Sequence, residues 1–420
     1  MKITILAVGT RGDVQPYIAL GLGLQAAGHT VRLAAASNFE QFVRGYGLSY
    51  ARLEGNFREL MAADSMQQFM TSRNPVSVYR EMTRLLRHGL ECFAADSWTA
   101  CQNSDAIIFS TIAVTGYSVA EKLGVPSCWA PLQPMSRTRT FPAVLSPFHT
   151  SRPGILNWLT HIVEEQTTWQ PVREFVNTWR KAFLSLEPFP FNGPYHSLEK
   201  KRFPIIYGYS PTVLPKPADW GSWIHVSGYW FLDRPEDWQP PVALVNFIEA
   251  GTPPMYVGFG SMNNREAKGM TRVVVDAITT AKQRAILATG WGSLHDADLP
   301  DTIFKVEAIP HDWLFPHLAA AIHHGGAGTT AAALRAGIPS IVIPQIMDQP
   351  FWGQRVFNLG VGPCPIPHKQ VTVKRLAEAI STTIMDKSMQ QRAAALGKQI
   401  RTENGIASAV EWVTHCLSTQ

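Results

Sequence analysis

The feature that most constrains the fold of this chain is the passage from a buried strand into a helix within its first 24 residues. Residues 3–8 form an uninterrupted run of apolar and β-branched residues. Gly9 and Gly12 follow, and a helical spacing of apolar residues then continues through Leu20 and Leu24. An apolar strand that turns through glycine into a helix is typical of a parallel sheet covered on both faces. The sequence therefore predicts an α/β domain.

The alternation of strand and helix occurs in two blocks. The first block continues with apolar runs at 31–36, 106–110 and 126–130. The second block has predicted strands at 255–259, 285–288, 320–323 and 340–343, and predicted helices at 271–280 and 328–336. Between the blocks, residues 210–241 contain six prolines, which interrupt regular structure. We therefore predict two doubly wound α/β domains, 1–215 and 216–420, joined by a linker at about 210–241 and facing each other across a cleft.

The composition excludes several classes of protein. Hydrophobic residues make up 45% of the 420 residues, enough for two cores and an apolar cleft. The net charge is only +5 and Lys and Arg form no block, so no nucleic-acid partner is expected. The five cysteines never show a C-x-x-C spacing, which argues against a zinc site and a disulfide framework and fits a cytoplasmic location. No apolar run approaches 18 residues, so no membrane-spanning helix is predicted.

The most informative segment is H-H-G-G-A-G-T-T at residues 323–330, between an apolar strand and an Ala-rich helix. Its glycines let backbone N–H groups approach a ligand, and the helix N-terminus behind them carries partial positive charge. These properties suit a diphosphate, to which His324 and Thr329 can add side-chain donors. The alternative interpretation is a glycine-rich turn in which Thr329 caps the helix and the histidine is part of the core.

A second polar pair follows the next predicted strand. That strand ends near Pro344 and delivers Asp348 and Gln349 to the carboxyl edge of the sheet, where such folds bind ligands. A carboxylate beside an amide can engage the neighbouring hydroxyl groups of a hexose. Without this context, an Asp-Gln pair is an ordinary surface feature.

Residues 310–362, with HHGGAGTT and DQPFWG, resemble the donor motif of the nucleotide-sugar glycosyltransferases of the GT-B fold, above all the sterol 3-beta-glucosyltransferases and the antibiotic (glycopeptide and macrolide) glycosyltransferases. The resemblance implies two Rossmann-like domains, a terminal helix at about 393–417 that crosses back to the first domain, and UDP-glucose as donor. This sequence differs from plant members at two positions: Ala308 stands where they carry a Trp, and Ala332 stands where they carry a Glu. Trp313 is either a stacking surface for the base or a core residue. The donor-binding residues that the resemblance implies are Ser261, Trp313, His324, Gly326, Ala327, Gly328, Thr329, Asp348 and Gln349.

Residues 9–24 resemble the same families and follow the first predicted strand, so that their loop opens toward the cleft. In the antibiotic enzymes the aspartate at the position of Asp13 is the general base. One carboxylate opposite the leaving group implies single displacement with inversion, and general-base assistance is typically worth about 10²–10⁴-fold in rate. The alternative is that Asp13 only caps the following helix. Gly12 is assigned to the acceptor side of this loop.

Residues 130–145 resemble a segment of the sterol glucosyltransferases. On that basis Trp129, Met135 and Phe141 are assigned to the acceptor pocket, the alternative being a loop packed on the domain core. Three arginines, Arg80, Arg84 and Arg87, fall on one helical face and could contact anionic lipid or simply lie in solvent.

Two other sites are weighed and set aside. Asp296 and Asp298 form a D-x-D away from the donor motif, so no metal site and no cofactor are predicted. The glycines of residues 9–12 do not have the G-x-G-x-x-G spacing of a nicotinamide-binding enzyme.

The sequence thus predicts an inverting, metal-independent hexosyltransferase acting on a UDP-sugar and a sterol-like acceptor. The expected protein is a monomer or weak dimer, with or without peripheral membrane contact. Alternatives are a macrolide, glycopeptide or hydroxy-lipid acceptor, or a binding protein without turnover.

Overall fold

The computed structural model describes residues 1–54, 75–147, 153–259, 264–288 and 299–419. The chain divides into two compact units: unit 1 comprises Met1–Leu232 and Asn404–Gln420, and unit 2 comprises Asp233–Glu403. The division lies inside the proline-rich segment, 17 residues beyond the predicted boundary at residue 215. The reason is β7 (Ile224–Val226), which pairs with β6 (Ile205–Tyr207) and so extends the sheet of unit 1 past that boundary.

Unit 1 contains a seven-stranded parallel sheet in the order β3-β2-β1-β4-β5-β6-β7, which confirms the predicted doubly wound α/β class. The order reverses between β1 and β4, so the loops that follow these strands open at the switch point of the sheet. The strands before β6 are β1 (Lys2–Leu6), β2 (Thr30–Ala36), β3 (Ser49–Leu53), β4 (Ala106–Phe109) and β5 (Ser127–Trp129).

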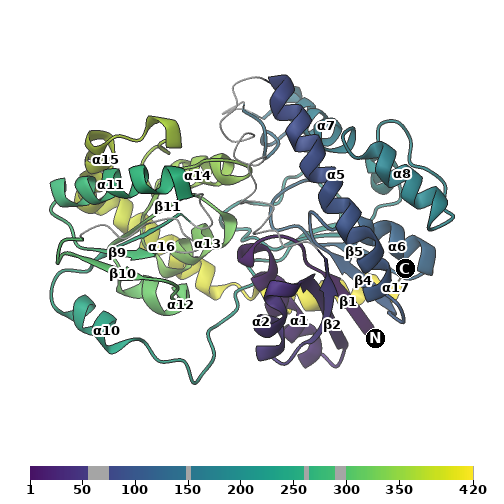
Figure 1. Ribbon diagram of the computed structural model, residues 1–420, viewed down its shortest axis with the longest axis horizontal. Coiled ribbons are helices and arrows are strands. Elements are labelled where there is room, and N and C mark those ends of the chain that lie inside the picture. The colour runs from purple at the N-terminus through teal and green to yellow at the C-terminus, as the bar shows by residue number, and fades with distance from the viewer. Residues whose placement is uncertain (55–74, 148–152, 260–263, 289–298, 420) are drawn as a thin grey trace. The chain divides into compact units, whose positions relative to one another are not determined.

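Helices cover this sheet and fill the long connection between β5 and β6 (Figure 1). The helices before that connection are α1 (Arg11–Ala26), α2 (Glu40–Gly45), α5 (Pro75–Ala100) and α6 (Thr115–Leu123). Those within it are α7 (Ile155–Trp169), α8 (Arg173–Ala182) and α9 (Tyr195–Lys200). Of the described helices, none is both long and apolar enough to cross a membrane.

The end of the chain returns to unit 1 as α17 (Gly405–Thr419), which packs on α1 (Figure 1). His29 Nε2 lies 3.1 Å from Thr414 Oγ1, and His225 Nε2 lies 2.8 Å from Ser408 Oγ. The sequence predicted one helix at 393–417, whereas the structure has two, because Asn404 interrupts the path and its side chain accepts a hydrogen bond from the N–H of Ala407.

We expect Gly23→Ala to loosen the contact between α1 and α17. A Cβ at residue 23 would lie 2.4 Å from Ile406 Cγ2, on a β-branched side chain that has little freedom to move. Overpacking of this kind costs about 1–3 kcal/mol, which urea unfolding would measure. Gly45→Ala is the matched control: its Cβ meets nothing within 4 Å, so an equal loss in both variants would contradict the packing argument.

Unit 2 contains a five-stranded parallel sheet in the order β10-β9-β8-β11-β12. Its side chains alternate between two cores. In β8, Met255 and Val257 belong to one core and Tyr256 belongs to the other, and β9 alternates in the same way. A sheet buried on both faces needs such apolar strands. The strands are β8 (Met255–Gly258), β9 (Ala285–Ala288), β10 (Ile303–Val306), β11 (Ala320–His323) and β12 (Ser340–Val342).

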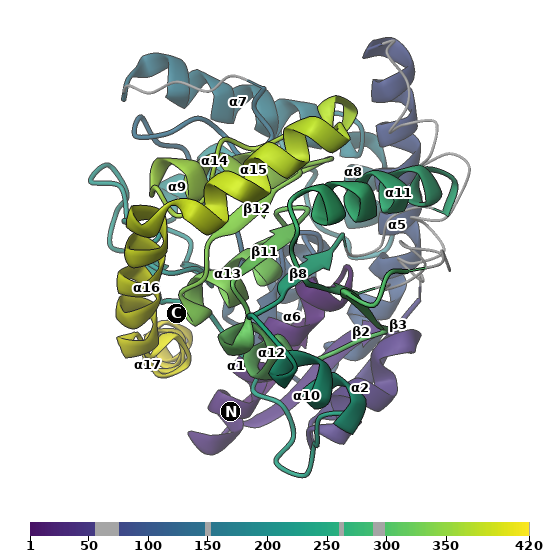
Figure 2. The same cartoon turned by 90° about the vertical axis from the view of Figure 1, so that its left-hand side faces the viewer.

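The helices of unit 2 lie on both sides of the strands (Figure 2). Figure 2 shows α11 and α15 on one side and α10 and α12 on the other. The strand order reverses between β8 and β11, so the turn after β11 lies at the switch point, where ligands bind in open α/β sheets. The helices are α10 (Val242–Glu249), α11 (Asn264–Thr280), α12 (His311–Leu314), α13 (Ala327–Ala336), α14 (Gln349–Asn358), α15 (Val373–Met385) and α16 (Lys387–Thr402).

Candidate active site

The predicted diphosphate cradle lies in unit 2, where β11 ends and α13 begins. His323 is the last residue of β11, and Gly326 is the N-cap of α13. Between them Gly325 has a φ of +91°, and a Cβ there would lie 2.7 Å from Val342 Cγ1. Glycine alone fits this turn. The first residues of α13, whose N–H groups have no acceptor within the helix, are Ala327, Gly328 and Thr329.

The ring of His324 lies over this turn. A Cβ on Gly326 would be 2.5 Å from His324 Nε2, so the missing side chain makes room for the imidazole. Burial lowers the pKa of His324 to about 4, and a hydrogen bond to the backbone of Gly258 acts in the opposite direction. Nδ1 is buried and has no partner among the described residues. In the ligand-free chain the ring is therefore neutral at pH 7, and attraction for an anion comes from the helix terminus rather than from an imidazolium.

Asp348 and Gln349 stand at the start of α14. Trp352 Nε1 donates a hydrogen bond to Asp348 Oδ2 at 2.9 Å. The backbone N–H groups of Gln345 and Ile346 donate to Gln349 Oε1 at 2.9 Å and 3.2 Å. Two donors therefore occupy the amide oxygen of Gln349, and its Nε2 is the group left for a sugar hydroxyl. The side chain of Gln349 can therefore donate a hydrogen bond to a sugar hydroxyl through Nε2, but its oxygen is already occupied.

The turn after β12 brings this pair against the cradle. Met347 precedes the pair and has a φ of +57°, which is uncommon for a residue with a side chain. On the other side, a Cβ on Gly325 would lie 2.9 Å from the backbone oxygen of Gln349. The two motifs that are separate in the sequence thus form one site at the start of α13 and α14.

Two further donor-site predictions have different outcomes. Trp313, in α12, is partly buried against one core of unit 2, with its ring centroid 5.5 Å from that of Trp238 and 5.1 Å from that of His317. These contacts describe a tryptophan in an aromatic cluster, and its stacking role stays a prediction. Ser261 lies outside the described residues, as does the D-x-D at 296–298.

In unit 1, the carboxylate of Asp13 folds back from the first turn of α1 onto the preceding loop. Thr10 donates to Asp13 Oδ2 from its backbone N–H and from Oγ1, each at 2.8 Å. Gly9 has a φ of +140°, and a Cβ there would lie 2.5 Å from the same oxygen. Burial raises the pKa of Asp13, while the bonds from Thr10 oppose the shift. One carboxylate oxygen therefore belongs to a capping box, in which Thr10 is the N-cap and Asp13 stands at N3 rather than at the N-cap, and Oδ1 is left to accept a proton.

Sequence reasoning missed the role of Thr10, although T-x-x-D before an apolar helix is a capping pattern that could have indicated it. Gly12, in the first turn of α1, is exposed. One turn beyond Asp13, the hydroxyl of Tyr17 donates to the backbone oxygen of Ala130 at 2.5 Å. The proposed base and the predicted acceptor segment 130–145 therefore adjoin each other within unit 1.

The three predicted acceptor residues differ in their surroundings. Trp129 is partly buried and packs against a core of unit 1, and its indole N–H is buried without a partner among the described residues. Phe141 is buried, with its ring centroid 6.1 Å from that of Trp220. Met135 is partly exposed, and its backbone N–H donates to the hydroxyl of Tyr207. Trp129 and Met135 are thus both partly exposed, whereas Phe141 is buried.

The backbone around Phe141 is hydrogen-bonded to α7 by four polar side chains, three of them buried, that the sequence analysis did not identify. Thr160 Oγ1 accepts from the N–H of residue 143 at 2.8 Å, and Glu164 Oε2 accepts from the N–H of residue 145 at 2.6 Å. His161 Nε2 lies 3.1 Å from the oxygen of residue 141, and Asn157 Nδ2 donates to the oxygen of residue 139. Side chains from α7 therefore fix the backbone of the predicted acceptor segment.

We expect Glu164→Gln to alter the pH dependence of stability. Burial raises the pKa of Glu164 from its ordinary value of 4.5 to about 7. Folding therefore takes up a proton between these values, and the free energy of unfolding falls as the pH rises through that window. Glutamine keeps an acceptor for the backbone but cannot ionise, so near pH 8 the variant should gain about 2–3 kcal/mol over the parent chain.

Urea unfolding between pH 4.5 and 8 would test this expectation. Glu165→Gln is the control, because Glu165 pairs with Arg137 at 2.6 Å and the loss of its charge leaves that guanidinium without a carboxylate at this position. Glu165→Gln should destabilise the fold. A parallel pH profile for Glu164→Gln and the parent chain would contradict a raised pKa at Glu164.

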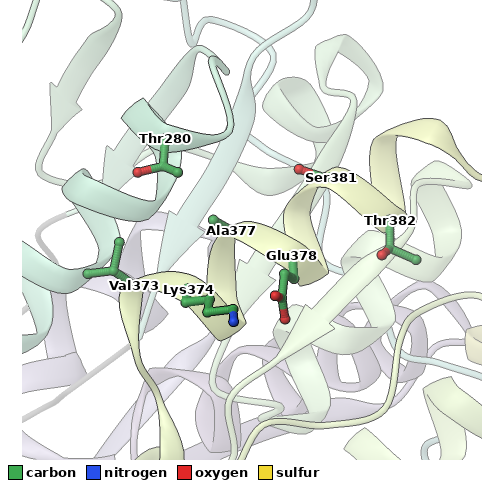
Figure 3. A pocket seen from close by; sticks show the side chains of 7 residues that line it. All are labelled: Thr280, Val373, Lys374, Ala377, Glu378, Ser381 and Thr382. Carbon is green, nitrogen blue, oxygen red and sulfur yellow. The ribbon is translucent and has the colours of Figure 1, made fainter.

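The arginines of α5 and a hollow between α11 and α15 contain none of the predicted site residues. Arg80, Arg84 and Arg87 on α5 are exposed, and Arg87 pairs with Glu91 of the same helix. A shallow hollow between α11 and α15 is lined by two aliphatic and five polar side chains, shown in Figure 3. They are Thr280, Val373, Lys374, Ala377, Glu378, Ser381 and Thr382. Thr280 ends α11 at the amino edge of the sheet, away from the cradle, and we assign the hollow no role.

Comparisons with known proteins agree with these two units. Residues 3–142 match the glycosyltransferase family 28 N-terminal domain, and residues 272–411 match the erythromycin biosynthesis protein CIII-like C-terminal domain. A sterol 3-beta-glucosyltransferase from Cryptococcus neoformans is 39% identical over 98% of this chain, and one from Aspergillus fumigatus is 38% identical over 98%. The chain spans only 27% and 29% of these relatives.

Among solved structures, the kitacinnamycin glycosyltransferase superposes with a TM-score of 0.72 at 18% identity, covering 99% of each chain. At that identity the likeness speaks for the fold, which is the two-domain GT-B architecture predicted from the sequence. The domain matches in both units and the identity to the curated relatives all point to glycosyltransferases. The chain has the GT-B fold, its two units match an N-terminal and a C-terminal domain of known glycosyltransferases, and almost its whole length is similar to the sterol 3-beta-glucosyltransferases.

Proposed function

We propose that this chain transfers glucose from UDP-glucose to a hydroxyl group of a sterol or sterol-like acceptor, with inversion at the anomeric carbon and without a metal ion. The observation that carries the proposal is the donor site of unit 2. A glycine turn, the free N–H groups at the start of α13, a neutral His324 and the amide nitrogen of Gln349 meet at one sheet edge. This set of donors suits a diphosphate joined to a sugar.

The leaving group in this proposal is the nucleoside diphosphate. Its negative charge grows as the bond to the anomeric carbon breaks, and the N–H groups of Ala327, Gly328 and Thr329 with the α13 dipole oppose that build-up. A neutral His324 has a single N–H, so it donates to the phosphate only by exchanging its hydrogen bond to the backbone of Gly258 for one to the ligand. Asp348 and Gln349 hold the sugar hydroxyls, so that the hexose keeps one orientation while the phosphate departs.

Asp13 is the proposed general base. The acceptor hydroxyl becomes more acidic as it bonds to the electron-poor anomeric carbon, and a carboxylate whose pKa is raised by burial can then take its proton. Thr10 engages Oδ2, so the side chain is held in one rotamer and Oδ1 receives the proton. One carboxylate and one displacement give inversion.

The acceptor class rests on the relatives and on residues 139–145, whose backbone is hydrogen-bonded to α7. The curated relatives are named for transfer to sterols, and they match almost all of this chain. The hydrogen bonds from α7 hold residues 139–145 in one conformation, which favours a rigid acceptor such as a fused-ring alcohol over a flexible one.

The proposal is tested by incubating the purified chain with UDP-glucose and cholesterol and measuring UDP release together with the steryl glucoside formed. The expected product has the β configuration, from an α-linked donor, and forms equally in the presence of EDTA. A macrolide or a hydroxy-lipid glycosylated in preference to the sterol would correct the acceptor. UDP binding without turnover on any acceptor would replace the enzyme with a binding protein, and an α-linked product would exclude the proposed role of Asp13.

A further inference from the structure

We propose that His323, the first histidine of the HHGG motif, is a positioning residue for the donor site: its imidazole accepts the N–H of Gly325 and so fixes the start of α13 against which the diphosphate binds. The inference rests on the proposed function, because it concerns the donor site of that reaction. His323 itself is 0% exposed and does not reach a ligand in this assignment.

The contact that carries the inference joins a side chain to the backbone of the turn. The N–H of Gly325 donates to His323 Nδ1 at 3.1 Å. His323 is itself anchored, since it pairs with Gly258 of β8 and Val342 of β12, and its carbonyl accepts from Ile343. A ring held by the centre of the sheet therefore determines where the N–H of Gly325 points.

This hydrogen bond also settles the tautomer of His323. Because Nδ1 accepts a hydrogen bond, the ring hydrogen is on Nε2. Burial lowers the pKa of His323 to about 3, and the neighbouring His324 and His311 lower it further. Nε2 is buried and has no partner among the described residues. The ring thus stays neutral, and its single acceptor nitrogen, Nδ1, receives the N–H of Gly325.

The two adjacent histidines have separate tasks in this arrangement. Successive side chains at the end of a strand point to opposite sides. His323 turns inward and holds Gly325, while His324 lies over Gly326 at the ligand-facing side of the turn. The N–H of Gly325 is consequently directed away from the ligand, and the N–H groups available to phosphate begin with α13 itself.

Loss of the acceptor at residue 323 should change the direction of this turn. A buried N–H without a partner is costly, so Gly325 would rotate to find one. Gly325 has the backbone freedom to do so, since its φ of +91° is one of several accessible values. Rotation at Gly325 would move Gly326 and the first N–H groups of α13 out of line with the diphosphate.

The test compares His323→Leu with His323→Asn. Both side chains branch at Cγ, but only Asn offers an oxygen near the position of Nδ1. Binding of UDP and of uridine is measured by calorimetry, with thermal unfolding as a check of the fold. We expect Leu to weaken UDP binding about 10- to 100-fold, to leave uridine binding unchanged, and Asn to restore UDP binding to within about threefold.

Each other outcome is informative. If the parent chain binds UDP and His323→Leu binds it equally well, or if Leu and Asn lose UDP and uridine together, His323 has no positioning role. If the parent chain itself does not bind UDP, the proposed function fails and this inference fails with it. Should His323→Leu not fold, ¹⁵N spectra of the parent chain decide: a His323 ring protonated on Nδ1, or one that titrates between about pH 5 and 9, overturns the assignment.

Discussion

Replacing Asp13 by Asn is expected to lower kcat by about 10²–10⁴-fold while the dissociation constant for UDP stays within about twofold of that of the parent chain. Asparagine has the same shape and can still accept from Thr10 through its side-chain oxygen, so the start of α1 is preserved. What it lacks is basicity. The proton of the acceptor hydroxyl then has no carboxylate to receive it, whereas the donor site in unit 2 keeps all of its own contacts.

The measurement is steady-state kinetics with saturating UDP-glucose, paired with calorimetric binding of UDP. Thr10→Val supplies a graded control, since it removes the Oγ1 bond to Asp13 and retains the backbone bond. That bond favours the charged carboxylate, so its loss should raise the pKa of Asp13 and move the acidic limb of the pH–rate profile to higher pH. A variant Asp13→Asn that turns over like the parent chain would leave Asp13 with its capping role alone.

The sequence predicted those parts of the site in which one short segment contains both the functional side chains and the strand, turn and helix start that position them. HHGGAGTT predicts a strand, a turn and a helix start, and the structure has β11, the glycine turn and α13 in that order. The Asp13 loop has the same character, because a strand and a helix follow each other within a few residues. Local sequence was sufficient where no distant partner decides the geometry.

Other parts depended on distant partners and were missed. The three-residue strands β6 and β7 owe their existence to pairing across the sheet, and their own residues show little periodicity. For that reason the two compact units divide after Leu232, inside the predicted linker but beyond residue 215. His323 is the corresponding case within the site, since two neighbouring histidines look alike in a sequence and only the backbone of Gly325 distinguishes them.

α7 shows why hydrophobic periodicity failed to indicate which helix holds the predicted acceptor segment in place. Leu156 is 66% exposed and Val163 is 64% exposed, whereas His161 and Glu164 are buried. A helix normally buries its apolar face. Here the inward face is polar because it hydrogen-bonds the irregular backbone of residues 139–145, which pairs with no strand in the part of the chain that the structure describes. Such a role can be recognised only when the segment on the other side is known.

Gly325→Ala is expected to weaken UDP binding at least about 100-fold, a loss of about 2.7 kcal/mol, and to lower the melting temperature. The native φ of +91° is costly for alanine. In addition, its Cβ would lie 2.7 Å from Val342 Cγ1 and 2.9 Å from the backbone oxygen of Gln349. Neither neighbour can retreat easily, since Val342 belongs to β12 and Gln349 begins α14. The turn must move, and both halves of the donor site move with it.

Gly325→Asn separates the two causes of this loss. Asparagine tolerates the left-handed region better than alanine does, so it relieves the cost in φ, but its Cβ meets the same two atoms. If close approach dominates, as the distances indicate, Asn should bind UDP as poorly as Ala. Gly269→Ala in α11 is the control for a general effect of added methyl groups, because its Cβ meets nothing within 4 Å and alanine favours helices. Normal UDP binding by Gly325→Asn would assign the requirement for glycine to backbone conformation alone, and normal binding by Gly325→Ala would remove the turn from the donor site.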